Sequence, residues 1–178
     1  MRVVDHFRHS IRTSPGKHLS REGVRLARSV GEALGDYDLV VTSTRPRAIE
    51  TAIAMGYASD RQLEDLGSMF GADLELDWTA GCSAFALAAE SSKVVARAAR
   101  KQARILQSIA ADLPQDGKAL VVSHGGVIEL GVVGLLPNHD FSAWGASCER
   151  CEGVRLHFDG STCTAAELLR LPDLVPSA

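Results

Sequence analysis

The sequence predicts an α/β domain in which helices cover both faces of a mostly parallel β-sheet. Short apolar runs typical of buried strands alternate along the chain with longer segments whose apolar residues recur at helical spacing. An Asp-Gly pair between two alternating segments near the C-terminus predicts a hairpin, and hence an antiparallel edge to the sheet. The 178 residues suffice for one ordinary domain with its own core. We therefore expect residues 1–178 to form a single three-layer αβα sandwich.

The predicted strands are short and mostly apolar. The first runs from Val3 to Phe7, although Asp5 and His6 are polar for a buried strand. Later strands are expected over 39–41, 119–122, 154–158 and 162–169. The run at 119–122 contains only Ala, Leu and Val, which makes it the clearest buried strand.

Helical spacing of apolar residues predicts four helices. Ser20 suits the N-cap of the first, Leu19 and Val24 have the spacing of a hydrophobic staple, and Gly35 fits its end. The other helices are expected over about 47–58, 90–113 and 126–136. The segment 59–84 is rich in Gly and Asp, and we expect it to be mostly irregular.

Composition sets bounds on the class of protein. A hydrophobic fraction of 46% and a charged fraction of 23% are typical of soluble globular proteins. The formal net charge of −3 implies no general attraction to nucleic acid or to anionic membranes, so any phosphate recognition must come from a few placed cations. No apolar run reaches the ~20 residues that span a bilayer, and the N-terminus lacks a secretory apolar region. We expect a cytoplasmic protein with neither nucleic-acid nor membrane partners, and its oligomeric state stays open.

The four cysteines are Cys82, Cys148, Cys151 and Cys163. Cys148 and Cys151 form a C-x-x-C pair, which is half of a zinc or redox motif. A structural zinc site usually shows a second tight pair or spaced histidines, whereas the other two cysteines here are isolated. We therefore favour ordinary thiols and expect no metal site.

Conspicuous polar residues follow three of the predicted strands. In chain order they are Arg8-His9-Ser10, Thr42-Ser43 with Arg45 and Arg47, and Ser123-His124-Gly125-Gly126. Ligands bind beyond the carboxyl ends of the strands in open α/β sheets. If these strands are parallel and adjacent, two histidines and at least two arginines converge on one crevice.

That set of residues suits phosphoryl transfer. The transferred group spreads its negative charge over three oxygens, so catalysis is mainly positioning and charge stabilisation. Arginine offers a planar fork that matches phosphate and stays charged. A neutral imidazole nitrogen can attack phosphorus and hold the group covalently. Gly125 and Gly126 would let a ligand approach the start of the following helix closely.

Four ordered motifs resemble those of the histidine phosphatase superfamily, also called phosphoglycerate-mutase-like. Arg8-His9-Ser10 matches the family motif Arg-His-Gly, and Leu19-Ser20-Arg21-Glu22-Gly23 matches Leu-Thr/Ser-x-x-Gly. The segment from Ser43 through Arg47-Ala48-Ile49-Glu50-Thr51-Ala52 matches Ser-x-x-x-Arg-Ala-x-x-Thr-Ala. The last motif, Val-x-His-Gly-Gly, is matched by Val122-Ser123-His124-Gly125-Gly126. The matched features extend from Val3 to about Leu136, so the resemblance implies the phosphoglycerate-mutase-like fold.

The resemblance also implies roles for individual residues. His9 would be the nucleophile that accepts the phosphoryl group, and Arg8, Arg47 and His124 would complete the phosphate pocket. The family places an acidic residue after the second helix, often in a Leu-x-Glu context before a glycine. The matching stretch is Leu63-Glu64-Asp65-Leu66-Gly67. The general acid is therefore Glu64 or Asp65, and we favour Glu64.

The chain departs from the family pattern around His9. Ser10 replaces the usual glycine, and the loop from Ser10 to His18 is shorter than in the mutases and carries Arg12. Arg12 is a candidate substrate contact, and Ser10, Gly125 and Asp65 are further ones. The chain also leaves little room for a substrate-specific cap.

The leading hypothesis is therefore a compact, metal-independent phosphomonoesterase of the histidine acid phosphatase type. It would need no cofactor and would act on a small phosphorylated metabolite or on a phosphoprotein. The alternatives are a phosphoglycerate-mutase-type phosphotransferase and a phosphate-binding module with weak turnover.

Overall fold

The computed structural model describes residues 1–71 and 77–175. Its strands are β1 (Arg2–Arg8), β2 (Leu39–Ser43), β3 (Arg61–Leu63), β4 (Lys118–Ser123), β5 (Gly153–Asp159) and β6 (Thr162–Leu169). Its helices are α1 (Arg21–Glu32), α2 (Pro46–Ala54), α3 (Gly81–Ser91), α4 (Lys93–Ala111), α5 (Val127–Leu135) and α6 (Leu171–Leu174). None of these helices is both long and apolar enough to cross a membrane.

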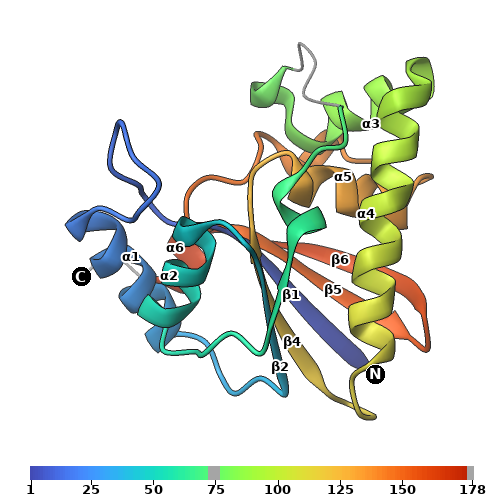
Figure 1. The fold of residues 1–178 in the computed structure, drawn as a ribbon. Coiled ribbons are helices and arrows are strands. Elements are labelled where there is room, and N and C mark those ends of the chain that lie inside the picture. The colour runs from blue at the N-terminus through green and yellow to red at the C-terminus, as the bar shows by residue number, and fades with distance from the viewer. Residues whose placement is uncertain (72–76, 176–178) are drawn as a thin grey trace.

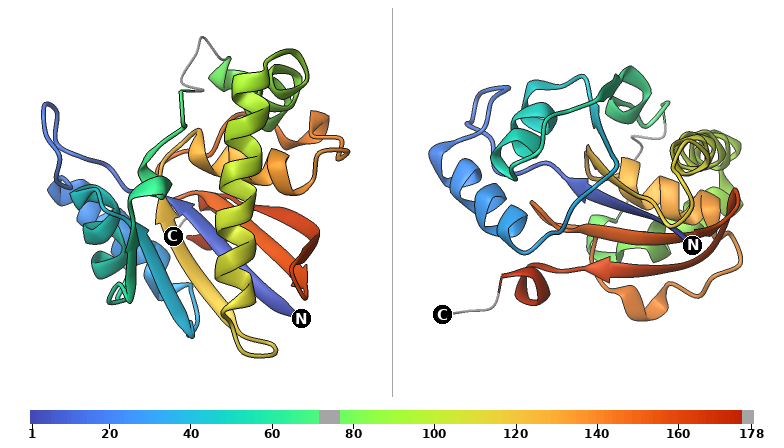
Figure 2. Two further views of the ribbon diagram at one scale, coloured as in Figure 1. Left: turned by 45° about the vertical axis from the view of Figure 1, so that its right-hand side comes forward. Right: turned by 90° about the horizontal axis from the view of Figure 1, so that it is seen from below.

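The described strands form one sheet in the order β3-β2-β4-β1-β5-β6. The four strands from β3 to β1 run parallel, whereas β5 and β6 are antiparallel to their neighbours. Figure 1 shows α1 and α2 on one face of the sheet and α4 on the other, and Figure 2 shows the same layering from two further directions. The predicted mostly parallel sheet with an antiparallel edge is confirmed.

Alternation along the central strands builds a separate core on each face. In β4, Val121 packs into the cluster formed with α3, α4 and α5, while Leu120 and Val122 pack into the cluster formed with α1 and α2. Val4 and Phe7 of β1 divide between the two clusters in the same way. This period of two explains why the central strands read as continuous apolar runs.

The predicted Ser20 cap and the predicted hairpin at Asp159-Gly160 are confirmed. The Ser20 hydroxyl accepts the backbone N–H of Gly23 at 3.0 Å and caps α1. The segment 114–117 forms a turn between α4 and β4, in which the Gly117 N–H donates to the Pro114 carbonyl at 3.1 Å. The pair Asp159-Gly160 connects β5 to β6, with Gly160 at a positive φ of 59°.

Three predicted boundaries are wrong. The second helix ends at Ala54 rather than near 58, because Gly56 leaves the helix with a φ of 100°. The helix expected over about 90–113 is α4, which starts only at Lys93, since Ser92 is extended and its side chain caps the helix by accepting the Val95 N–H. The segment 59–84 is more regular than expected, because it contains β3 and the start of α3. Its residues 72–76 lie outside the described part of the chain.

Candidate active site

The carboxyl ends of β1 and β4 bring two histidines together. The two strands are parallel neighbours with Arg8 opposite Ser123, so the next residue of each strand is a histidine at the same edge of the sheet. The rings of His9 and His124 have centroids 5.1 Å apart and planes inclined by 61°. Both side chains are buried. Sheet register alone therefore positions the pair.

His9 presents a free lone pair on one defined nitrogen. Its Nδ1 lies 2.7 Å from the carbonyl oxygen of Ser10, which only accepts, so Nδ1 carries the proton and Nε2 the lone pair. Two guanidinium groups donate to that Nε2, Arg47 through Nε and Arg150 through Nη1, each at 3.0 Å.

The pKa of His9 is lowered to about 2. Burial is the main cause, and the neighbouring His124, Arg150 and Arg47 disfavour a further positive charge. The ring is therefore neutral at any ordinary pH and its Nε2 is unprotonated.

His124 is held by the end of β2. Its Nε2 lies 2.7 Å from the hydroxyl of Ser43, and its Nδ1 is buried without a hydrogen-bond partner in the described residues. Burial, and then the charges of Arg47 and Arg45, lower its pKa to about 3. The second histidine is therefore also neutral and retains one polar atom for a ligand.

Arg8 passes beneath the loop that follows His124. Its Nη1 donates to the Cys148 carbonyl at 2.7 Å, and its Nε is buried without a partner among the described residues. A Cβ added to Gly125 would lie 3.1 Å from the Arg8 Cζ, so this glycine makes room for the guanidinium. The N–H of Gly126 donates to the Glu129 carboxylate at 2.6 Å and is already occupied. Gly125 thus accommodates an arginine and the Gly126 N–H binds a carboxylate, where the sequence suggested direct approach by a ligand.

Ser10 faces the protein interior and ties three elements together. Its hydroxyl donates to the Gly23 carbonyl at 2.7 Å, and its N–H donates to the Thr51 hydroxyl at 2.9 Å. Thr51 in turn donates to the Arg47 carbonyl at 2.6 Å. Because the serine hydroxyl is buried and engaged, the structure places Ser10 in support of His9 and Arg47 and away from a substrate contact.

The two candidate acids lie on different sides of one turn. Glu64 accepts the Thr44 hydroxyl at 2.7 Å and lies 3.9 Å from the Arg45 guanidinium, beside the site. Asp65 lies 3.9 Å from Lys101 of α4, away from it. Both carboxylates are exposed. The geometry thus places Glu64, and not Asp65, at the edge that carries the histidines.

Arg12 lies on the exposed loop between β1 and α1. Its guanidinium donates to the Gly16 carbonyl at 2.9 Å. Its charge contributes to lowering the pKa of both Arg47 and Arg150. Arg12 is therefore close to the site electrostatically without contacting either histidine.

Sequence reasoning missed Arg150, which is 141 positions from His9 along the chain. It lies between the two cysteines of the C-x-x-C pair, and that motif drew attention to the thiols. The segment carrying it closes over the end of β1, since the Cys151 N–H donates to the Arg8 carbonyl at 3.1 Å. No spacing rule links such distant positions, so only the fold identifies this arginine.

The carboxylate of Glu129 was missed as well. It is almost completely buried and accepts the N–H of Gly126 at 2.6 Å and that of Cys148 at 2.9 Å. Burial raises its pKa. Glu129 thereby joins the start of α5 to the residue whose carbonyl holds Arg8.

The cysteines of the C-x-x-C pair are both buried. Burial raises the pKa of the Cys151 thiol to about 11 and that of Cys148 well above its usual value. Within residues 1–71 and 77–175, no group of three or more His, Cys, Asp or Glu side chains is arranged to hold a metal ion. The two thiols thus lie in the packing of the loop that presents Arg150.

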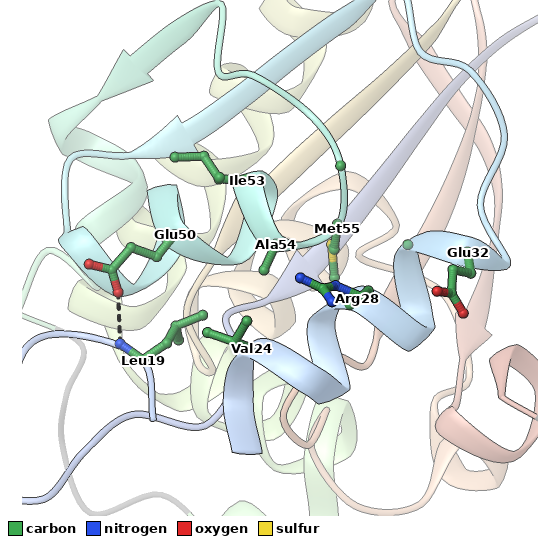
Figure 3. A pocket seen from close by; sticks show the side chains of 10 residues that line it. Leu19, Val24, Arg28, Glu32, Glu50, Ile53, Ala54 and Met55 are labelled. Carbon is green, nitrogen blue, oxygen red and sulfur yellow. Dashed lines mark hydrogen bonds between the residues drawn. The ribbon is translucent and has the colours of Figure 1, made fainter. Parts of the chain in front are cut away.

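A second, larger cavity lies away from the histidines. A groove of about 650 Å³ runs between α1 and α2 and is lined by apolar side chains such as Val24, Ile53 and Met55. Figure 3 shows these side chains, with Arg28 and Glu32 on the α1 side and Glu50 accepting a hydrogen bond from the backbone of Leu19.

The model of the histidine phosphatase superfamily (branch 1) matches residues 7–169. The chain belongs to the histidine phosphatase superfamily. A search of curated protein sequences gave no significant match. Similar solved structures show the phosphoglycerate-mutase-like fold expected for this superfamily.

Two of these structures match nearly the whole chain. Phosphoserine phosphatase from Entamoeba histolytica, in complex with 3-phosphoglyceric acid, is 18% identical with a TM-score of 0.72, over 98% of this chain and 100% of that one. Phosphoglycerate mutase from Bacillus anthracis is 16% identical with a TM-score of 0.66, over 97% and 94%.

A mycobacterial glucosyl-3-phosphoglycerate phosphatase in complex with VO3 is 19% identical with a TM-score of 0.62, over 88% of this chain and 93% of that one. At these identities the structures establish the fold, and both phosphatases and a mutase are among them.

Proposed function

We propose that this member of the superfamily is a phosphomonoesterase that needs no metal and works through a phosphohistidine on His9. The observation that carries the proposal is the neutral His9 ring, whose Nε2 lone pair lies between the guanidinium groups of Arg47 and Arg150. Because the pKa of His9 is about 2, its Nε2 lone pair is available to attack even in acid. This availability supports the histidine acid phosphatase type.

In the first step the Nε2 lone pair attacks phosphorus and the bond from phosphorus to the ester oxygen breaks. Arg47 and Arg150 turn from the lone pair to the phosphoryl oxygens, and Arg8 adds a third positive charge to the pocket. Charge that develops on those oxygens is then stabilised by groups already in place. The Ser10 carbonyl accepts a hydrogen bond from the Nδ1–H and stabilises the positive charge that the imidazole gains.

The leaving alcohol requires a proton, and Glu64 is our candidate to supply it. Its carboxyl group lies beside Thr44, directly after the serine that holds His124. In the second step the resulting carboxylate takes a proton from water, the oxygen of that water attacks phosphorus, and the bond from nitrogen to phosphorus breaks. Inorganic phosphate leaves and His9 is restored as the neutral base.

The substrate we propose is a small phosphorylated molecule. Support comes from the E. histolytica phosphatase complex with 3-phosphoglyceric acid. A phosphoglycerate-mutase-type reaction would use the same phosphohistidine, but it would return the phosphoryl group to an alcohol and release little phosphate.

Hydrolysis of p-nitrophenyl phosphate by wild type and His9→Ala tests the nucleophile. We expect multiple turnovers by wild type and a loss of about 10³-fold or more in the variant, as for removal of other covalent nucleophiles. The exposed His139→Ala serves as the matched control and is expected to retain full activity. Alkaline denaturation during turnover should trap an acid-labile phosphoryl group on wild type only.

Two results would contradict the proposal. Full activity of His9→Ala would remove the nucleophile assignment. A stable phosphohistidine that forms once without release of phosphate would instead indicate a phosphate-binding module with weak turnover.

A further inference from the structure

A cationic cavity opens beside the candidate active site. It measures about 420 Å³, and its lining residues are Lys17, Thr44, Arg45, Pro46, Arg47 and Gly67. Three of these residues carry positive charge and none carries a carboxylate. Such a lining favours an anionic occupant.

Arg47 belongs both to the lining of the cavity and to the surroundings of His9. The Nε of this residue donates to the His9 Nε2 at 3.0 Å, while the same side chain lines the cavity. Arg45 is also near the pocket, because its charge contributes to lowering the pKa of His124. A molecule with its phosphoryl group at His9 therefore extends its alcohol portion past these two arginines.

The remaining two cations have few internal partners. Lys17 makes no hydrogen bond or ion pair with the described residues, and Arg45 has only the 3.9 Å contact with Glu64. A Cβ added to Gly67 would lie 3.3 Å from the Arg45 Nε, so the absence of a side chain there leaves space for this guanidinium. The charges of Lys17 and Arg45 are thus available to a ligand.

The loop that carries Lys17 is held in place at its base. Arg12 and Leu19 form an isolated β-bridge, and the Thr13 N–H donates to the His18 carbonyl at 3.0 Å. The Leu19 N–H donates to the Glu50 carboxylate of α2 at 2.7 Å. Figure 1 shows this loop projecting between β1 and α1. These contacts fix the base of the loop, and Lys17 lies in the segment between them.

The positive charge around the site exceeds what one phosphoryl group matches. Arg8, Arg47 and Arg150 surround the histidines and suffice for a phosphate dianion. Lys17 and Arg45 then remain, with Glu64 as the nearby carboxylate.

We infer that the substrate carries a second anionic group on its alcohol portion, and that Lys17 and Arg45 bind that group in the cavity next to Arg47. The inference rests on the proposed phosphatase function and specifies its substrate class. A carboxylate and a second phosphate share the required chemistry, because each accepts charge-assisted hydrogen bonds from ammonium and guanidinium groups.

The test compares kcat/KM for ethyl phosphate and for phosphoglycolate, which replaces the methyl group by a carboxylate. Ethylene glycol bisphosphate distinguishes the case of a second phosphate. We expect the kcat/KM of wild type to be about tenfold or more higher for at least one of the two substrates with a second anionic group than for ethyl phosphate. One or two charge-assisted hydrogen bonds account for a difference of this size. Lys17→Met and Arg45→Gln should each reduce that preference by about tenfold, mainly through KM.

Lys118→Met is the matched control, because Lys118 is exposed at the amino end of β4, opposite the site. Its preference should equal that of wild type. Equal kcat/KM values of wild type for all three substrates would overturn the inference. So would an unchanged preference in both the Lys17 and Arg45 variants.

A binding measurement separates this inference from the proposed function. Calorimetric titration with phosphonoacetate and with ethylphosphonate reports the second anion without turnover. Tighter binding of phosphonoacetate by wild type, lost in Lys17→Met, supports the subsite even if no ester is hydrolysed. Equal binding of the two phosphonates overturns a carboxylate as the second anion even in an active phosphatase, and the bisphosphate then decides the inference.

Discussion

The groove between α1 and α2 and the crevice at the strand ends are opposite kinds of surface. The groove is the larger, at about 650 Å³, and its lining combines apolar side chains with exposed charges. The crevice is associated with a cavity of about 420 Å³, but its histidines are buried and their pKa values are strongly lowered. The groove contains no histidine among its lining residues.

The difference teaches that cavity size does not locate chemistry in this protein. Catalysis by charge stabilisation requires converging cations and a base kept neutral by burial, and of the two regions compared only the strand ends combine them. The groove follows from close packing of two helices, since Gly31 of α1 lies directly against the Met55 carbonyl. Four predictions test this contrast, in order of decreasing effect.

The largest expected effect concerns acid stability. His6, His9 and His124 are buried with folded pKa values of about 3, 2 and 3, below the unfolded value of 6.5. As pH falls below 6.5, the unfolded chain takes up protons that the folded chain does not. The free energy of unfolding therefore decreases as pH falls from 6.5 to the folded pKa values of about 2 to 3. Between pH 7 and pH 5 each histidine removes roughly 2 kcal/mol, or about 6 kcal/mol for the three.

His6→Gln isolates one of these contributions in urea unfolding at both pH values. His6 lies 2.6 Å from the Ser123 hydroxyl through Nε2, and glutamine can still make a hydrogen bond there. We expect the variant to lose about 2 kcal/mol less than wild type over this interval. The exposed His139→Gln is the control, and an equal loss in all three proteins would refute the assignment.

The second prediction compares two arginines. Arg47→Gln removes a donor to the reacting group and should lower kcat/KM by about 10²–10³-fold, as for loss of one transition-state donor. Arg28→Gln removes an arginine from the groove and should change kcat/KM by less than about twofold. Similar losses in both variants would mean that the groove takes part in the reaction.

The third prediction separates Glu64 from Asp65. Glu64→Gln should lower kcat for an alkyl phosphate by about 10²-fold, because an alkoxide needs a proton to leave. The effect should be much smaller with p-nitrophenyl phosphate, whose leaving group needs no proton. Asp65→Asn is the matched control and should change kcat little. The reverse pattern would assign the acid to Asp65.

The smallest effect is structural and confined to the groove. Gly31→Ala places a Cβ about as close as 2.1 Å to the Met55 carbonyl oxygen, so α1 and α2 must move apart. We expect a destabilisation of about 1–3 kcal/mol in thermal or urea unfolding. The kcat of the folded variant should remain near that of wild type, and a large loss of kcat would couple the groove to the site.

Much of the fold was predictable because its signals are local. Apolar periodicity located the central strands and α1, and the Ser20 cap and the Asp159-Gly160 hairpin have short-range causes. α3 was missed because its start lies in the segment 59–84, whose Gly and Asp content predicted irregular structure. β3 was missed because its three residues are too few to show a pattern.

The sequence by itself determined the two strand-end histidines, since each follows directly from the apolar run that precedes it. Only the tertiary structure decided which nitrogen of His9 carries the lone pair, which acid borders the site, and that Arg150 belongs to it. These properties depend on contacts between distant segments and on burial, which changes the charge state of a side chain. Local spacing encodes the position of a residue in an element, whereas chemistry depends on what the fold places around it.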